Sequence, residues 1–265
     1  MDERVEDLFR EASRVHPTAS LSRIRDALLN PEVRPSAHFQ NPGFLFLPFL
    51  SGSAWHSTPN APWVTEFEDS FEAIRNEFNE LSESNLGFSQ YVEPEGSPPF
   101  WKGDWRACYF FHSGIWFPET VSACPMTANL LRKVHRLDEY ALYSSLEPGG
   151  EIKPHSGPWN ARLTFHFGVQ IPEASQIRVG GVTRKWKEGS FIVFDDSFEH
   201  EASNKDSSAR VVVMFTVWHP ELSDVEIEIL KRYDRLFPIA GHQKYLDQLL
   251  ANSRSSYNRH SCGDT

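Results

Sequence analysis

Short runs of β-branched and aromatic residues, separated by turn residues, dominate the stretch from residue 144 to residue 220. The clearest runs are Leu163 to Val169, Ser190 to Phe194 and Arg210 to Val217, with Gly, Pro and Asn between them. Strands of this length and spacing are typical of a small β-sandwich or β-barrel rather than a helical domain. We therefore predict that this part of the chain forms a β core.

Elsewhere the apolar positions recur every three or four residues, which indicates amphipathic helices. The first such segment is residues 2–15. A second helix is expected to begin after Ser20 and to end before Pro31, because proline cannot continue a helix. Further helices are predicted at residues 66–81, 125–133, 223–235 and 243–250, and one additional strand at residues 105–111.

These patterns divide the chain into three segments. Residues 1–40 are expected to form an N-terminal helical extension. Residues 41–250 are expected to form one domain around the β core, whose central motif spans residues 140–222, because no internal repeat or long linker interrupts them. Residues 251–265 lack apolar periodicity, so we predict a flexible C-terminal tail there. The expected class is a mainly β fold with flanking helices.

Composition and charge narrow the classes of partner. With 265 residues and 40% hydrophobic content, the chain is long and apolar enough for a real core. A formal charge of −10 argues against nucleic acid and against anionic membrane surfaces, which require a basic face. No apolar run approaches the roughly 20 residues of a membrane span. We expect no nucleic-acid partner and no membrane partner.

Compartment and redox state follow from the N-terminus and the cysteines. The N-terminus is charged from its second residue, so it resembles no secretory signal, and a cytoplasmic location is expected. Cys108, Cys124 and Cys262 are widely spaced, which favours neither a disulfide framework nor a zinc cluster. A bridge between Cys108 and Cys124 is conceivable, but we favour two buried thiols.

Two histidines and one arginine in the β-rich stretch carry the candidate chemistry. A non-haem iron centre for oxygen chemistry uses two histidines and one carboxylate, commonly as His-x-Asp/Glu followed by a distant His. Here His155 and His200 match the histidines, but Gly157 stands where the acid is expected. Arg210, on the strand after His200, is suited to hold the distal carboxylate of 2-oxoglutarate in a bidentate pair.

The residues alone leave other interpretations open. Any two of eleven histidines are more often ordinary loop and strand residues than ligands. Several acids cluster around His200, and Asp195 or Asp196 would reach a metal if the turn folded back. We favour a structural role for these acids in the turn between two strands, because an Asp side chain readily hydrogen-bonds nearby backbone groups.

The order of motifs in this region closely resembles the aspartyl/asparaginyl β-hydroxylase family of iron- and 2-oxoglutarate-dependent oxygenases. The similarity is strongest from about Ser144 to Leu222, and a looser likeness extends back to about residue 45. The matching positions are Glu147 to Gly150, Pro154 to Pro158, Asn160, Arg162, Leu163, His166, Gly168, Ile171, Pro172, Trp186, Glu188, Gly189, Phe194 to Glu201, Arg210 and Val217 to Leu222.

This resemblance implies a double-stranded β-helix (jelly-roll, cupin-like) core and two cofactors, Fe(II) and 2-oxoglutarate. It implies that His155 and His200 bind the iron with glycine in the third ligand's place. It further implies that Arg210 and Ser144 hold the side-chain carboxylate of 2-oxoglutarate, and that His166 lies beside the chelating end of the cosubstrate or beside the substrate.

Three further residues are candidates for substrate contact. Arg162 matches a basic position of the family's motif, and Trp159 stands next to the metal motif as a pocket wall or a lid. Thr164 is a departure, because the best-known peptide hydroxylases of the family carry a second basic residue there. An aspartyl side chain is therefore a less suitable substrate than a small free polar molecule, such as an amino acid derivative or a biosynthetic intermediate.

The sequence thus predicts a 2-oxoglutarate-dependent dioxygenase that hydroxylates an unactivated C–H bond, with dioxygen and a small molecule as partners. Its oligomeric state is left open. Three alternatives remain: the same centre used for another oxidation such as halogenation or desaturation, a non-catalytic β-sandwich binding protein, and a zinc hydrolase built on the two histidines and a nearby acid.

Overall fold

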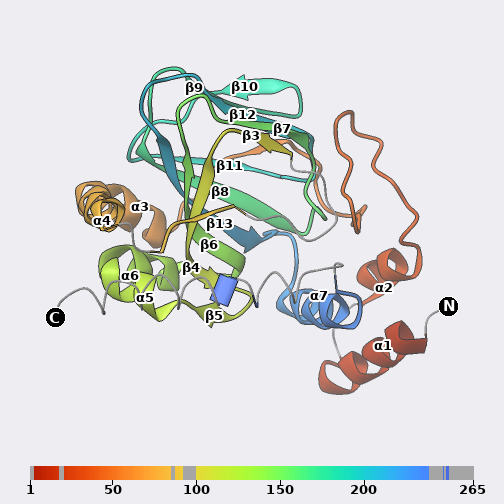
Figure 1. Cartoon of the computed structure of the whole chain (residues 1–265). Coiled ribbons are helices and arrows are strands. Elements are labelled where there is room, and N and C mark those ends of the chain that lie inside the picture. Colours follow the sequence, from red (N-terminus) through yellow and green to blue (C-terminus); the bar gives the residue numbers. More distant parts are fainter. Residues whose placement is uncertain are drawn as a thin grey trace.

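Two antiparallel β-sheets face each other in the computed structural model of the chain, and the helices lie beside the larger sheet and at one end of the sheets (Figure 1). The structure describes residues 3–17, 21–84, 87–91, 100–238, 247 and 249–250. The helices are α1 (Glu3–Val15), α2 (Ser22–Leu29), α3 (Pro62–Asp69), α4 (Phe71–Glu83), α5 (Pro118–Ala123), α6 (Pro125–Lys133) and α7 (Asp224–Leu236). The strands are β1 (Trp55–His56), β2 (Ser89–Gln90), β3 (Trp101–Lys102), β4 (Trp105–His112), β5 (Ile115–Trp116), β6 (Leu137–Leu146), β7 (Glu151–His155), β8 (Arg162–Gln170), β9 (Ser175–Val179), β10 (Val182–Arg184), β11 (Phe191–Phe194), β12 (His200–Asn204) and β13 (Arg210–Trp218).

Successive strands of the core alternate between the two sheets. The larger sheet has the order β1-β11-β8-β13-β6-β4-β2, with β5 paired to β4, and the smaller sheet has the order β10-β9-β12-β7-β3. Strands β6, β8, β11 and β13 therefore lie in one sheet, while β7, β9 and β12 lie in the other. This winding is that of a jelly roll. The predicted class, mainly β with flanking helices around a double-stranded β-helix, is confirmed.

Helices α3, α4 and α6 cover the outer face of the larger sheet (Figure 1). Alternate residues of each strand point outward, so Phe165 and Phe215 of neighbouring strands stack there with ring centroids 5.2 Å apart. Phe67 of α3 packs on Phe215 from the helix side. Because the helices occupy this outer face, the inner face of the larger sheet is left for contacts with the smaller sheet.

The helix predicted at residues 66–81 is two helices, and the prediction of a single one was wrong. Ser70 ends α3 and precedes α4, with a ψ angle of 8° that departs from helical geometry. The break changes the direction of the chain, so that Phe67 in α3 and Ile74 in α4 are both fully buried against the same sheet. Helix α3 also begins earlier than expected, with Pro62 at its first turn.

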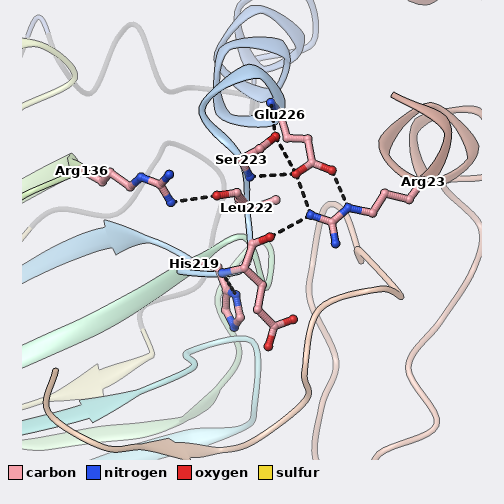
Figure 2. Close-up of polar contacts among 7 residues, drawn as sticks. Arg23, Arg136, His219, Leu222, Ser223 and Glu226 are labelled. Carbon is pink, nitrogen blue, oxygen red and sulfur yellow. Dashed lines mark hydrogen bonds and ion pairs between the residues drawn. The ribbon is translucent and has the colours of Figure 1, made fainter. Parts of the chain in front are cut away.

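Helices α1 and α2 share a hydrophobic cluster with part of the β core. They pack with α7 and with Trp159, which follows His155 closely in the sequence. Figure 2 shows the polar contacts between α2 and α7. Arg23 of α2 forms a bidentate ion pair with Glu226 of α7, at 2.6 and 2.7 Å, and it also donates to the main-chain carbonyl oxygen of Glu221. Glu226 simultaneously caps α7 through Ser223.

Several sequence predictions agree with the described residues. The helices expected at residues 2–15, 125–133 and 223–235 correspond to α1, α6 and α7, and the strand expected at residues 105–111 corresponds to β4. Cys108 and Cys124 are buried free thiols. Most of the helix predicted at residues 243–250, and all of the tail at residues 251–265, lie outside the described residues. Among the helices described, none has the length and apolar character needed to cross a membrane.

Gly168 of β8 is hydrogen-bonded to the backbone of residues 187–190, which runs close beside it. A Cβ atom at residue 168 would collide with the carbonyl oxygen of Lys187, which is backbone and cannot rotate away. We expect Gly168→Ala to lower the free energy of unfolding by about 1–3 kcal/mol, the usual cost of overpacking, as measured by urea denaturation. Gly43→Ala is the matched control, because a Cβ atom at residue 43 has no neighbour within 4 Å. Equal stability of the two variants would contradict this account.

Candidate active site

His155 and His200 lie side by side on adjacent strands of the smaller sheet. His155 ends β7 and His200 begins β12, and the two residues are direct partners in the antiparallel register. Their ring centroids are 4.0 Å apart. Each Nδ1 atom lies in hydrogen-bond contact with a main-chain carbonyl oxygen two residues earlier in the chain, at 2.8 Å from Lys153 and 2.9 Å from Phe198. Donation from Nδ1 leaves the lone pair of Nε2 for a metal ion, so the pair fits two ligands of one ion.

The environment keeps both imidazoles neutral. Burial lowers the pKa of His155, and burial together with the neighbouring ring of His155 lowers the pKa of His200 to about 3. Neutral imidazole is the form that binds a metal. At neutral pH the two rings are therefore already in the form that binds a metal ion.

The acid that is absent at residue 157 is replaced in space by another carboxylate. A Cβ atom at Gly157 would lie 2.5 Å from Oδ1 and 2.8 Å from Oδ2 of Asp196. Asp195 performs the turn work expected of this cluster, since the Ser197 amide donates to it at 2.9 Å. Within the described part of the chain, no three His, Cys, Asp or Glu side chains converge as a metal-binding group. The geometry thus places two imidazoles side by side, with the Asp196 carboxyl group beside Gly157.

Arg210 lies on the inner face of the larger sheet, 1% exposed, next to Ser144 of the adjacent strand. Its Nη1 atom donates to Ser144 Oγ at 3.5 Å, and Trp105 Nε1 donates to the same oxygen at 3.0 Å. Arg210 Nε is buried and has no hydrogen-bond partner among the described residues. Burial without a carboxylate lowers the pKa of the guanidinium. A buried, incompletely paired guanidinium is a receptor for a carboxylate.

His166 lies near both His200 and Arg210. Trp186 Nε1 donates to His166 Nδ1 at 3.1 Å, which fixes the ring proton on Nε2. Burial, then the charge of Arg210 and the proximity of His200, hold the pKa of His166 well below its ordinary value. Its Nε2 atom is buried and has no partner among the described residues. His166 therefore presents a neutral N–H donor on the same inner face.

The three predicted substrate residues are placed differently from one another. Thr164 lies on the inner face, and its hydroxyl donates to Asp196 at 3.3 Å. Arg162 is buried between the rings of Trp159 and Trp218, 4.2 and 4.6 Å from their centroids. Trp159 belongs to the cluster shared with the N-terminal helices. Thr164 contacts Asp196, which lies beside Gly157, while His166 lies near both His200 and Arg210. The substrate contact of Thr164, Arg162 and Trp159 stays a prediction.

Two features of the site were missed in the sequence. The positions of Trp105 and Trp186, which hold Ser144 and His166, required the strand register. Asp196 was considered together with its neighbour Asp195, and residue type alone could not separate their roles. A usable signal was the alternation of β11, because successive side chains of a strand point to opposite faces, and Asp195 and Asp196 directly follow that strand.

The chain belongs to the aspartyl/asparaginyl β-hydroxylase family, which it matches over residues 68–220. It is 33% identical over 212 residues to aspartate beta-hydroxylase domain-containing protein 2 of Homo sapiens, covering 74% of this chain and 55% of that protein. It is 35% identical over 183 residues to aspartyl/asparaginyl beta-hydroxylase of Mus musculus, covering 66% of this chain and 24% of that protein.

A bacterial relative and a solved structure complete the comparison. The chain is 32% identical over 163 residues to ornithine lipid ester-linked acyl 2-hydroxylase of Rhizobium tropici, covering 60% of this chain and 58% of that protein. The chain therefore spans between about a quarter and three fifths of the length of these relatives. The cupin domain of Schizosaccharomyces pombe Cnp3 covers 54% of this chain and 79% of its own length, with a TM-score of 0.32 and 10% identity.

Proposed function

We propose that this chain is an Fe(II)- and 2-oxoglutarate-dependent dioxygenase that hydroxylates an unactivated C–H bond of a small polar substrate. Such a substrate is an amino acid derivative or a biosynthetic intermediate. The observation that carries the proposal is the pairing of two facing neutral imidazoles with a buried, incompletely paired guanidinium at the inner face of one β core. The naming of relatives as hydroxylases supports it. The buried thiols of Cys108 and Cys124 support a reducing compartment such as the cytoplasm.

Each residue has a defined task in this proposal. His155 and His200 bind the iron through Nε2, while their Nδ1 contacts with backbone carbonyls fix the ring orientations. Arg210 and Ser144 bind the distal carboxylate of 2-oxoglutarate, and His166 donates its Nε2 proton to an oxygen atom of the bound ligands. When bound, iron, 2-oxoglutarate and dioxygen supply the oxidising chemistry, with succinate and carbon dioxide as coproducts.

Aromatic side chains enclose the proposed cosubstrate site. The ring of Trp186 lies 4.8 Å from the guanidinium carbon of Arg210, and Phe194 contacts the rings of both His166 and His200. These apolar surfaces exclude water from the charged groups and strengthen the attraction of Arg210 for a carboxylate.

The position of Asp196 favours hydroxylation over halogenation. The Asp196 side chain occupies the space beside Gly157 that a chloride ion in the third ligand's place would need. Steric occupation of that space therefore disfavours halogenation.

The direct test is formation of succinate from 2-oxoglutarate by the purified protein supplied with Fe(II) under air. We expect succinate formation that requires iron and dioxygen, and that rises when a substrate is added from a library of amino acid derivatives. Replacement of iron by zinc is expected to abolish it. An iron-loaded protein that forms no succinate, or that acts without dioxygen, would overturn the proposal.

Restoring the missing acid is expected to harm this protein rather than to improve it. In Gly157→Asp the new side chain would meet the short, half-buried Asp196 side chain, so we expect the free energy of unfolding to fall by about 1–3 kcal/mol. Asp196→Ala and the double variant Gly157→Asp/Asp196→Ala complete a double-mutant cycle measured by urea denaturation. We expect the double variant to recover stability relative to Gly157→Asp. Additive losses would contradict the steric account.

A further inference from the structure

An aromatic side chain covers one face of the imidazole of His155. The ring of Phe100 stacks on it, with centroids 4.1 Å apart and planes inclined by 29°. The ring of His200 lies 4.0 Å from the same imidazole. Among the described residues no ring contact joins Phe100 to His200, so these two rings lie on opposite faces of His155. His155 is therefore held between Phe100 and His200.

The backbone fixes Phe100 beside the strand that ends at His155. The Lys153 amide donates to the Phe100 carbonyl oxygen at 2.6 Å, and the next residue, Trp101, pairs with Ile152 across β3 and β7. These main-chain contacts do not depend on the aromatic ring. The backbone at residue 100 therefore keeps its place when the side chain is changed, which makes variants at this position usable.

Phe100 is the aromatic side chain closest to the two proposed ligands. Among the described phenylalanine, tyrosine and tryptophan rings, its centroid distance from His155 is the shortest to either histidine, whereas Phe194 lies 5.6 Å from His200. Phe194 is 2% exposed and Trp105 is 5% exposed, so packing encloses both. Phe100 is only half-buried, which leaves part of its surface open to a reacting group.

This position makes the Phe100 ring a neighbour of the proposed reaction. A metal ion bound to an imidazole nitrogen lies in the plane of that imidazole, so a ring stacked on the imidazole lies directly beside the ion. Under the proposed function, dioxygen and 2-oxoglutarate are consumed there to hydroxylate a C–H bond of the substrate. Without substrate, the nearest aromatic C–H bonds are those of Phe100, and proximity is a dominant factor in such a step.

We propose that Phe100 is a site of self-hydroxylation, at which the protein converts its own phenyl ring to a hydroxyphenyl ring when substrate is absent. The inference rests on the proposed function, because it uses the oxidants of that same centre. One oxygen atom of dioxygen enters the new ring C–O bond, and the displaced ring hydrogen is replaced by the hydroxyl proton. The other oxygen atom enters succinate as 2-oxoglutarate loses carbon dioxide. The ring and 2-oxoglutarate each give up two electrons, which together reduce dioxygen.

Incubation with Fe(II), 2-oxoglutarate and isotope-labelled dioxygen, without substrate, tests the proposal by mass spectrometry. We expect the protein to gain one labelled oxygen atom, which peptide mapping places at Phe100. Succinate formation with no label at residue 100, or with the label at Phe194 or Trp105 instead, overturns this inference alone. Absence of succinate overturns the proposed function and this inference with it. The map of the wild-type protein decides the question without any variant.

Two variants confirm the position of the label. Phe100→Leu removes the ring and is expected to gain no labelled oxygen. Phe49→Leu is the matched control, because Phe49 is also half-buried but packs in the cluster of α1, α2 and α7. It should gain the label as the wild type does. A label that persists in Phe100→Leu overturns the assignment.

A binding measurement without turnover tests the geometry separately. Protein labelled with para-fluorophenylalanine is titrated with Mn(II) in the absence of dioxygen and 2-oxoglutarate, and fluorine NMR is recorded. The signal of residue 100, identified by its loss in Phe100→Leu, is expected to broaden beyond detection, because a bound paramagnetic ion relaxes nearby nuclei. The signal of residue 49 should stay sharp. A residue 100 signal that stays sharp at saturating Mn(II) overturns the inference.

Discussion

Replacing His200 by alanine is expected to remove iron binding and with it all succinate formation. The proposed centre has two protein ligands, and loss of an outer partner alone usually costs about 10–100-fold in metal affinity. Loss of a direct ligand should cost more, so we expect the affinity for Mn(II), titrated in place of iron, to fall at least about 100-fold. The deleted ring is part-exposed and, among the aromatic rings of the described residues, contacts those of His155 and Phe194, so the fold should survive.

His135→Ala is the matched control for this experiment, because His135 is an exposed residue outside the β core. It should bind Mn(II) as the wild type does. Retention of stoichiometric metal binding in His200→Ala would show that the facing imidazoles are not the ligands, even if their geometry is correct.

Replacing Arg210 by methionine is expected to weaken 2-oxoglutarate binding severely while stabilising the empty protein. Removing one partner of a desolvated charge pair costs about 2–4 kcal/mol, which corresponds to about 30- to 700-fold in affinity. The guanidinium is buried without a carboxylate, so its removal relieves a desolvation cost in the absence of ligand. The affinity for 2-oxoglutarate should therefore fall, while the urea midpoint measured without 2-oxoglutarate should rise.

Arg178→Ala serves as the comparison for Arg210. Arg178 is a cation of β9 that pairs with Glu199 and Glu201 near the surface, so its loss should leave the 2-oxoglutarate constant unchanged. Arg210→Lys keeps the charge but loses the planar fork, and it should fall between the wild type and Arg210→Met. An unchanged affinity for 2-oxoglutarate in Arg210→Met would contradict the assignment of Arg210 to the 2-oxoglutarate carboxylate.

Strands β4, β8, β11 and β13 and most helices could be predicted because their signals are local. The run Leu163 to Val169 is buried on both faces of β8, and the predicted bounds of these four strands lie within one residue of the observed ones. The facing of His155 and His200 was anticipated only through the family's motif. Their register across β7 and β12 depends on the pairing of segments far apart in the chain, which periodicity does not encode.

The remaining features depend on three-dimensional context. The register shift in β6, where Asp138 and Glu139 both bind Arg162, leaves no mark in residue types, because neither residue is glycine. The separation of Asp195 from Asp196 depends on which side of the turn faces Gly157. Likewise, the helix break at Ser70 followed from packing against the sheet rather than from a helix-breaking residue.

The loop that carries His155 is completed by chain from outside the family match. The amides of Gly43, Phe44 and Leu45 donate to the carbonyl oxygens of Gly157 and Pro158, and the Asn160 side chain bonds both backbone groups of Leu47. The family match begins only at residue 68. A fragment cut at that border would keep the motifs between Ser144 and Leu222 yet leave the carbonyl oxygens of Gly157 and Pro158 without these donors, so it should fail to fold as an independent domain.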